Sequence, residues 1–218
     1  MATIKKNSSV KAFTRWLSKN FRTEWEMACN TNPNRGKTYD QWEFLKMFSR
    51  DRGDGHGASK TVHVLEHIVV KRHQTGGYIP NVRREHAKCT GNQLIDEINC
   101  WNEMAETADA DLLCPVLKYF TSKSDKVSAT SETMQHNVVI IAQKAVRIGN
   151  ADYACRKAYE LNRDNGFRGE SPAVRYEKLE KLSAKKGWRD AMYNPGNSGV
   201  IFDYEKGYYK AVFIDYAL

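Results

Sequence analysis

Residues 194–218 read NPGNSGVIFDYEKGYYKAVFIDYAL, and this C-terminal stretch is the most informative part of the sequence. The runs SGVIF (198–202) and KAVFI (210–214) are rich in the β-branched and aromatic residues of strands. The polar segment between them holds Gly207, so the two runs are predicted to form a β-hairpin. A turn centred on Lys206 places Asn197 opposite Asp215, where opposed Cβ atoms lie about 4.5–5.5 Å apart. An amide oxygen and a carboxylate are therefore expected side by side.

The segment before this hairpin, residues 150–186, is predicted to be helical. Its second part has clear helix boundaries: Ser171 suits the N-cap, Pro172 the first helical position, and Gly187 the position just past the end. Residues 1–50 are also predicted to be helical, because apolar residues recur there at helical spacing.

The middle of the chain is predicted to be rich in strands. A glycine-rich loop, RDRGDGHGAS (50–59), precedes one apolar strand, VHVLEHIVVK (62–71). Residues 112–120 and 137–142 are further strands, and Pro115 confines the first of these to a sheet edge or a bulge. Residues 92–107 have the apolar face of an amphipathic helix, which should pack on the sheet. We expect three to five strands with one packed helix, an α+β fold.

The composition narrows the class of protein. With 218 residues, 41% hydrophobic and 28% charged, the chain can fold around its own core. The five cysteines are odd in number and form no CxxC pair, and no signal peptide is recognisable, so a reducing cytoplasm is expected. No apolar run reaches the roughly 18 residues of a membrane helix, so no membrane association is expected.

The net charge of +8 is concentrated at the N-terminal end. Residues 1–50 hold ten Lys or Arg against four Asp or Glu, so they carry six of the eight net charges. Such a segment suits nucleic acid, an acidic partner protein or plain solvent exposure. Arg15, Trp16, Lys19, Phe21 and Arg22 mix charged and aromatic side chains, as single-stranded nucleic-acid sites do.

Metal and hydrolase motifs are poorly supported. On one strand His63 and His67 would lie about 13 Å apart by the rise of roughly 3.3 Å per residue, too far to share an ion. His86 and Cys89 lack partners at zinc-finger spacing. A Cys/His or Ser/His/Asp hydrolase stays open, although no GxSxG motif occurs.

Five features in chain order resemble the protein-kinase family: the loop GDGHGAS, Lys71 closing IVVK, Glu97 in LIDEINCW, NPGNSGV and IDYAL. Among kinases the sequence looks most like the early-gene Ser/Thr protein kinases of short-tailed coliphages. The resemblance covers residues 50–218. It implies a compact bilobal fold: a basic helical extension (1–50), a lobe with a small antiparallel sheet and one helix (51–149), and a reduced helical lobe ending in the hairpin (150–218).

The resemblance also implies site roles. Gly53 and Gly55 would let the backbone approach the ATP phosphates, and Lys71 would pair with those phosphates while Glu97 holds it in place. Asn197 and Asp215 would bind magnesium through oxygen. The expected activity is ATP- and magnesium-dependent transfer of phosphate to Ser or Thr of host proteins, in the host cytoplasm.

The sequence departs from the kinase pattern at two points. The base aspartate should precede the metal-binding asparagine by five residues, where this chain has Met192. Asp190, in a Trp188–Arg189–Asp190 tripeptide that resembles HRD, could replace it. The chain also ends three residues after Asp215, so an activation segment and later peptide-binding helices are not expected. The alternative is a pseudokinase that inhibits a host transcription or defence machine without catalysis.

Overall fold

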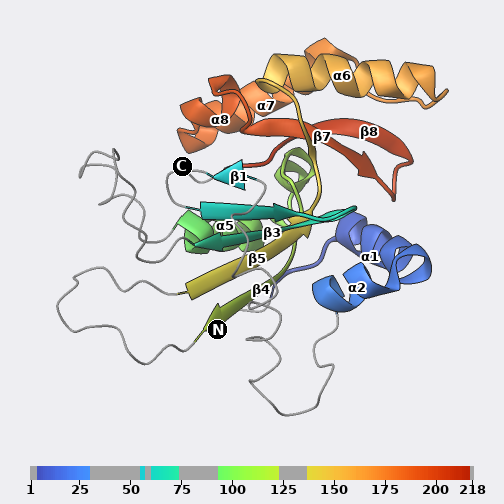
Figure 1. The fold of residues 1–218 in the computed structure, drawn as a ribbon. Helices are drawn as coiled ribbons and strands as arrows, with labels where there is room; N and C mark the ends of the chain where they lie inside the picture. Colours follow the sequence, from blue (N-terminus) through green and yellow to red (C-terminus); the bar gives the residue numbers. More distant parts are fainter. Residues whose placement is uncertain (1–3, 30–54, 57–59, 74–92, 123–136, 217–218) are drawn as a thin grey trace.

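The computed structural model describes residues 4–29, 55–56, 60–73, 93–122 and 137–216. They form a mixed helix-and-sheet fold with two antiparallel sheets (Figure 1). The first has five strands in the order β1-β2-β3-β5-β4, with bounds β1 (Gly55–His56), β2 (Lys60–Val64), β3 (Ile68–His73), β4 (Val116–Ser122) and β5 (Asn137–Gln143). The second has three strands in the order β6-β7-β8, with bounds β6 (Val146–Arg147), β7 (Ser198–Asp203) and β8 (Tyr208–Phe213).

The helices lie in three places (Figure 1). Helix α5 (Gln93–Met104) packs on the five-stranded sheet, and the 3₁₀ helix η1 (Ala108–Leu112) follows it. Helices α6 (Ala151–Asp164), α7 (Pro172–Lys186) and α8 (Arg189–Tyr193) form a layer over β7 and β8. The N-terminal helices α1 (Ser8–Asn20) and α2 (Arg22–Cys29) lie beside both sheets. None of the described helices is both long enough and apolar enough to span a membrane.

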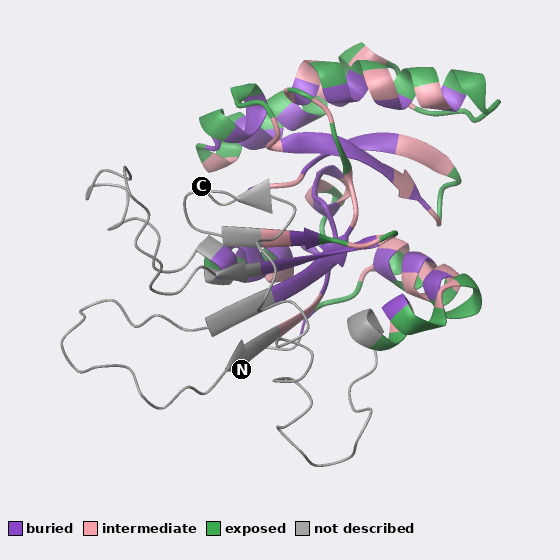
Figure 2. Ribbon diagram, in the orientation of Figure 1, coloured by how far each residue is buried: buried purple, intermediate pink, exposed green. Residues whose placement is uncertain are grey.

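The core runs continuously from the N-terminal helices to the last strands. Buried side chains from α1, α5, both sheets and α7 belong to one hydrophobic cluster. Figure 2 shows the burial concentrated on β7, β8 and the central strands, while the outer faces of α6 and α7 are exposed. The two sheets meet where the Cys114 N–H donates to the Phe213 carbonyl oxygen (2.8 Å).

Helix α7 confirms the boundaries predicted from the sequence. The Ser171 hydroxyl accepts the Val174 N–H, Pro172 opens the helix, and Gly187 ends it with φ +73°. A left-handed backbone at the end of a helix favours glycine because a Cβ would clash there. The prediction for Pro115 is also confirmed, since it precedes an edge strand with a register shift between Val116 and Lys118.

The single strand predicted over residues 62–71 is wrong. The structure has two antiparallel strands, β2 and β3, joined by a turn at Leu65–Glu66–His67. His63 and His67 therefore do not share a strand, and the separation argued for them does not apply. Gly55 also differs from the prediction, because it lies in strand β1 rather than in a loop, whereas Gly53 lies outside the described residues.

The C-terminal hairpin is confirmed, but its predicted register is wrong by one residue. The pairing runs from Ser198 with Phe213 to Asp203 with Tyr208, which leaves a four-residue turn. The Gly207 N–H donates to the Asp203 carbonyl oxygen (2.7 Å), and Gly207 has φ +73°. The turn is therefore centred between residues 205 and 206 rather than on Lys206.

Candidate functional site

A buried ion pair between the five-stranded sheet and α5 forms the centre of the candidate site. Lys71 Nζ lies 2.5 Å from Glu97 Oε1, and the two side chains are only 3% and 1% exposed. β3 lies between β2 and β5, where Lys71 pairs with Val62 and Ile140. Glu97 occupies the buried face of α5 with Leu94. Two distant segments thus bring opposite charges together away from solvent.

Lys71 also reaches the chain just after β8. Its ammonium donates a hydrogen bond to the Ile214 carbonyl oxygen (2.8 Å). Burial by itself would lower the pKa of Lys71, but the charges of Glu97 and Asp215 outweigh it and raise this pKa above its ordinary value. Lys71 therefore stays a cation, and the elements carrying Glu97 and Asp215 both face it.

Asn197 and Asp215 are neighbours through the main chain. In the observed register Asn197 faces Ile214, so the expected direct opposition of Asn197 and Asp215 is corrected. The Asn197 carbonyl oxygen accepts the N–H of Ile214 (2.8 Å) and, more weakly, that of Asp215 (3.4 Å). The Asn197 side-chain amide donates to the Asp190 carbonyl oxygen (3.2 Å). Asn197, just before β7, thus lies beside the main chain of Asp215, just after β8, and of Asp190 in α8.

The candidate base residues have different surroundings. Asp190 is exposed in the first turn of α8, and its main chain is tied to Asn197. Met192 is buried among core side chains, so it faces no substrate. Asp190 thus has the accessibility that a base requires, while Met192 serves packing.

Gly55 lies in register with Lys71. Gly55 pairs with Val62, which pairs in turn with Lys71 on the next strand. Adjacent strands are about 4.8 Å apart, so the Gly55 backbone is two strand spacings, roughly 10 Å, from that of Lys71. The loop that leads from β1 to β2 lies outside the described residues.

Asn197 and Asp215 carry side-chain oxygens, the kind of donor that magnesium takes. No group of three or more His, Cys, Asp or Glu able to hold a metal ion occurs among the described residues. Magnesium is commonly held by only one or two protein oxygens, together with water and phosphate oxygens. The Asp215 carboxylate and the Asn197 side-chain oxygen could provide those two.

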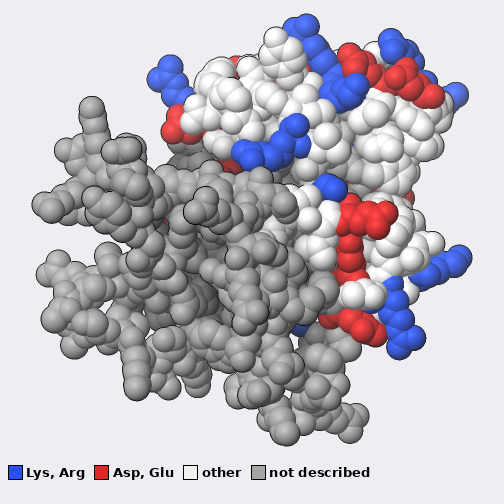
Figure 3. Space-filling model, viewed as in Figure 1, with Lys and Arg blue, Asp and Glu red and all other residues white. Residues whose placement is uncertain are grey.

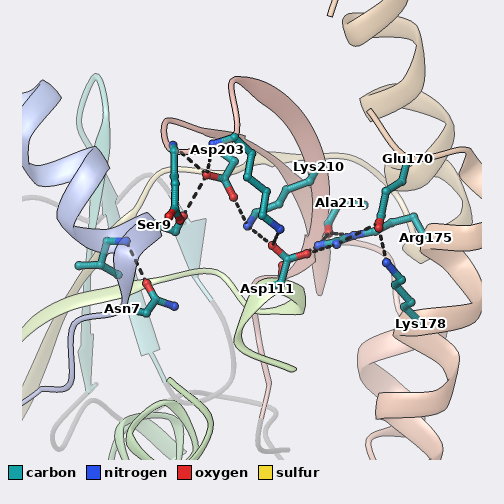
Figure 4. A network of polar contacts seen from close by, with 12 residues as sticks. Asn7, Ser9, Asp111, Glu170, Arg175, Lys178, Asp203, Lys210 and Ala211 are labelled. Atoms are coloured by element: carbon teal, nitrogen blue, oxygen red, sulfur yellow. Dashed lines mark hydrogen bonds and ion pairs between the residues drawn. The ribbon is translucent and has the colours of Figure 1, made fainter. Parts of the chain in front are cut away.

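A second charged network, which was not predicted from the sequence, is centred on Asp111 (Figure 4). Asp111 in η1 forms ion pairs with Arg175 of α7 (2.5 Å) and Lys210 of β8 (2.7 Å), and Lys210 also pairs with Asp203 (2.6 Å). Burial would raise the pKa of Asp111, but Arg175 and Lys210 hold it well below its usual range. Arg175 shares the buried side of α7 with Leu179 and Leu182. A cation on an apolar helix face is the signal that could have revealed this network.

The aromatic residues near the N-terminus are used for packing. Trp16 contacts the rings of Tyr204 (4.4 Å between centroids) and His67 (4.9 Å), and Phe21 also contacts His67 (3.9 Å). Trp16 and Phe21 are partly buried against the core, and their role in stacking on nucleic-acid bases stays a prediction. Elsewhere, Lys/Arg and Asp/Glu lie side by side over the helical layer at the top of Figure 3.

The described cysteine side chains have no disulfide partners. Cys100, Cys114 and Cys155 are free and buried, and burial raises the pKa of each thiol to about 12. They are therefore poor nucleophiles, which weakens the Cys/His hydrolase alternative.

Comparison with known protein families, curated proteins and solved structures gives no match.

Proposed function

We propose that this protein is an ATP- and magnesium-dependent phosphotransferase with a compact, kinase-like bilobal fold, which phosphorylates Ser or Thr of proteins. The sequence resembles the early-gene protein kinases of coliphages. The substrates would therefore be proteins of a bacterial host infected by a phage. The observation that carries it is the buried Lys71–Glu97 pair, whose lysine also contacts the residue next to Asp215.

Lys71 supports the proposal because burying a cation costs free energy, which only a strong partner offsets. Glu97 neutralises it, and the raised pKa keeps the ammonium charged. Charge stabilisation and positioning supply most of the catalysis in phosphoryl transfer. A fixed ammonium close to the Asp215 carboxylate would supply both.

The remaining site residues have complementary roles in this proposal. Asp215 and Asn197 would hold the magnesium ion, which neutralises charge on the phosphates. Asp190 would orient the substrate hydroxyl and accept its proton. The hydrogen bond from the Asn197 side-chain amide to the Asp190 carbonyl oxygen would hold the magnesium ligand and the base at a fixed distance.

Asp215→Asn is the sharpest test of this function. It removes one charge at a half-buried position and keeps the shape of the side chain. We expect wild-type protein to be stabilised by MgATP, by about 2.7 kcal/mol at 100 times Kd, and to transfer label from ATP to protein. In Asp215→Asn the transfer should fall by about 100-fold or more.

Asp164→Asn is the matched control, because Asp164 is an exposed carboxylate at the end of α6. It should behave as wild type in both assays. Two results would contradict the proposal: label transfer from ATP that persists in Asp215→Asn, or a wild-type melting temperature that does not change when MgATP is added.

A second candidate is a pseudokinase that binds nucleotide or a host protein without catalysis. The buried Met192, at the position where a kinase has its base, favours it. This candidate predicts that the wild-type protein binds MgATP but transfers no label to protein. It also predicts that Asp190→Asn binds MgATP as the wild type does.

A further inference from the structure

The N-terminal segment, defined as residues 4–29, contacts three elements that carry the candidate site. These are the β2–β3 turn that leads to Lys71, helix α5 that carries Glu97, and the β7–β8 turn of the hairpin that ends near Asp215. Each element is contacted through hydrogen bonds or aromatic rings of the segment.

The first contact holds the β2–β3 turn. The Glu24 carboxylate, in a residue only 8% exposed, accepts the N–H groups of Glu66 (2.9 Å) and His67 (2.9 Å). The His67 carbonyl oxygen accepts the Lys144 N–H (2.8 Å), so the turn is held from both sides. β3 begins at the next residue, and Lys71 follows three residues later. Hydrogen bonds to an ionised carboxylate are about twice as strong as neutral ones.

The second contact holds the hairpin turn. Tyr204 packs against Trp16 (4.4 Å between ring centroids) and Phe13 (5.3 Å). The Ser9 hydroxyl donates to Asp203 Oδ1 (3.3 Å), as Figure 4 shows. Since Trp16 also contacts His67 of the first turn, one indole ring touches both turns.

The third contact holds α5. The Lys5 N–H donates to the Asn102 side chain (2.9 Å), and the Trp101 indole N–H donates to the Lys5 carbonyl oxygen (2.9 Å). Trp101 lies one helical turn beyond Glu97 and is fully buried. The segment therefore fixes the helix that positions the partner of Lys71.

We infer that the N-terminal segment positions the two halves of the candidate site, with Glu24 and Trp16 as its positioning residues. The segment joins the β2–β3 turn to the hairpin turn, at the end of β8 opposite to Ile214 and Asp215, and so fixes how β3 lies against the hairpin that carries those two residues. The catalytic meaning of this positioning rests on the proposed function, but the spatial coupling does not.

The test compares Glu24→Gln and Trp16→Leu with wild type in the full chain. Glu26→Gln is the matched control, because Glu26 lies on the same helix but is exposed and pairs only locally with Arg22. Each protein is treated with acetic anhydride at low concentration, and acetylation of individual lysines is followed by mass spectrometry. Lys210 is the internal standard for Glu24→Gln: it is as buried as Lys71, at 3%, and it pairs with Asp111 and Asp203, whereas Glu24 holds Glu66 and His67.

We expect Lys71 to be acetylated at least five times faster in Glu24→Gln and Trp16→Leu, with Lys210 unchanged in Glu24→Gln. Glu26→Gln should match wild type at both lysines. Equal acceleration at both lysines in Glu24→Gln would indicate general loosening and would overturn the inference. An unchanged rate at Lys71 would also overturn it. If Glu24→Gln does not fold, Glu24→Asp, which keeps the carboxylate, replaces it with the same criteria.

Binding of MgATP distinguishes failure of this inference from failure of the proposed function. If wild type binds MgATP, Glu24→Gln should weaken the affinity by about tenfold, while Glu26→Gln should not. If wild type binds no MgATP, the proposed function fails, yet the acetylation rates of Lys71 and Lys210 still decide the positioning role.

Discussion

The buried Lys71–Glu97 pair is the most demanding feature at the scale of single residues. Removing two charges from water costs several kcal/mol per ion, and only close pairing offsets this cost. The 2.5 Å contact with Glu97 and the 2.8 Å bond to the Ile214 carbonyl give Lys71 two acceptors in the interior. Such a pair adds little net stability, so its retention is easier to explain by chemistry than by folding.

Glu97→Gln should destabilise the protein strongly. The change leaves the Lys71 ammonium buried without its directly paired carboxylate, and breaking one side of a buried pair costs about 3–5 kcal/mol. Urea unfolding measures the loss. Glu103→Gln removes an exposed carboxylate from the same helix and should cost less than about 1 kcal/mol. Equal losses in the two variants would mean that the pair contributes no more than a surface contact.

At the scale of elements, the turn of the β7–β8 hairpin sets the register. Gly207 takes a left-handed backbone, and a Cβ built there meets nothing within 4 Å. The Asp203 carboxylate accepts the N–H groups of Glu205 and Lys206 (3.0 and 3.2 Å). This local Asx-type turn, rather than the flanking strands, fixes the four-residue loop.

Gly207→Ala should cost about 1–2 kcal/mol, because the left-handed conformation is unfavourable for a residue with a Cβ and space is not limiting. Gly207→Asn should cost less, since asparagine tolerates this conformation better. Thermal or urea unfolding measures both. Equal stability of the alanine variant and wild type would show that the turn adopts another backbone.

Elements differed in how well the sequence revealed them. Helix α7 was predicted to the residue because its capping signals at Ser171 and Gly187 are local. The turn at Glu66 was missed because its stabilising group, the Glu24 carboxylate, comes from a distant helix. The hairpin was found, but its register was off by one, since a turn centred on Lys206 and the observed turn differ by half a residue.

At the scale of the whole molecule, the Asp111 network joins three regions. It connects η1 to α7 through Arg175 and to the hairpin through Lys210. Burial would raise the pKa of Asp203, but Lys210 and main-chain N–H groups lower it below its ordinary value, as Arg175 and Lys210 do for Asp111. Both carboxylates thus favour the folded state only while they are ionised.

Stability should therefore fall on acidification. A carboxylate with a depressed folded-state pKa contributes fully above its unfolded pKa of about 3.9, and this contribution is lost as pH falls towards the folded value. We expect unfolding free energy to decline steeply below about pH 4. Asp111→Asn should be less stable at pH 7 and should show a shallower decline. Urea titrations from pH 7 to pH 2 measure this, and a slope in Asp111→Asn equal to that of wild type would contradict it.

The sequence was enough to predict the mixed helix-and-sheet class, the ends of α7 and the edge position of β4, and the order of its motifs singled out Lys71 and Glu97. Each depends on short-range periodicity, backbone preference or motif order, which neighbouring residues carry. Only the tertiary structure shows that Lys71 also reaches Ile214, that Asn197 faces Ile214, and that Glu24 holds the β2–β3 turn. These contacts join residues far apart in the chain, and their geometry exists only once packing has brought the segments together.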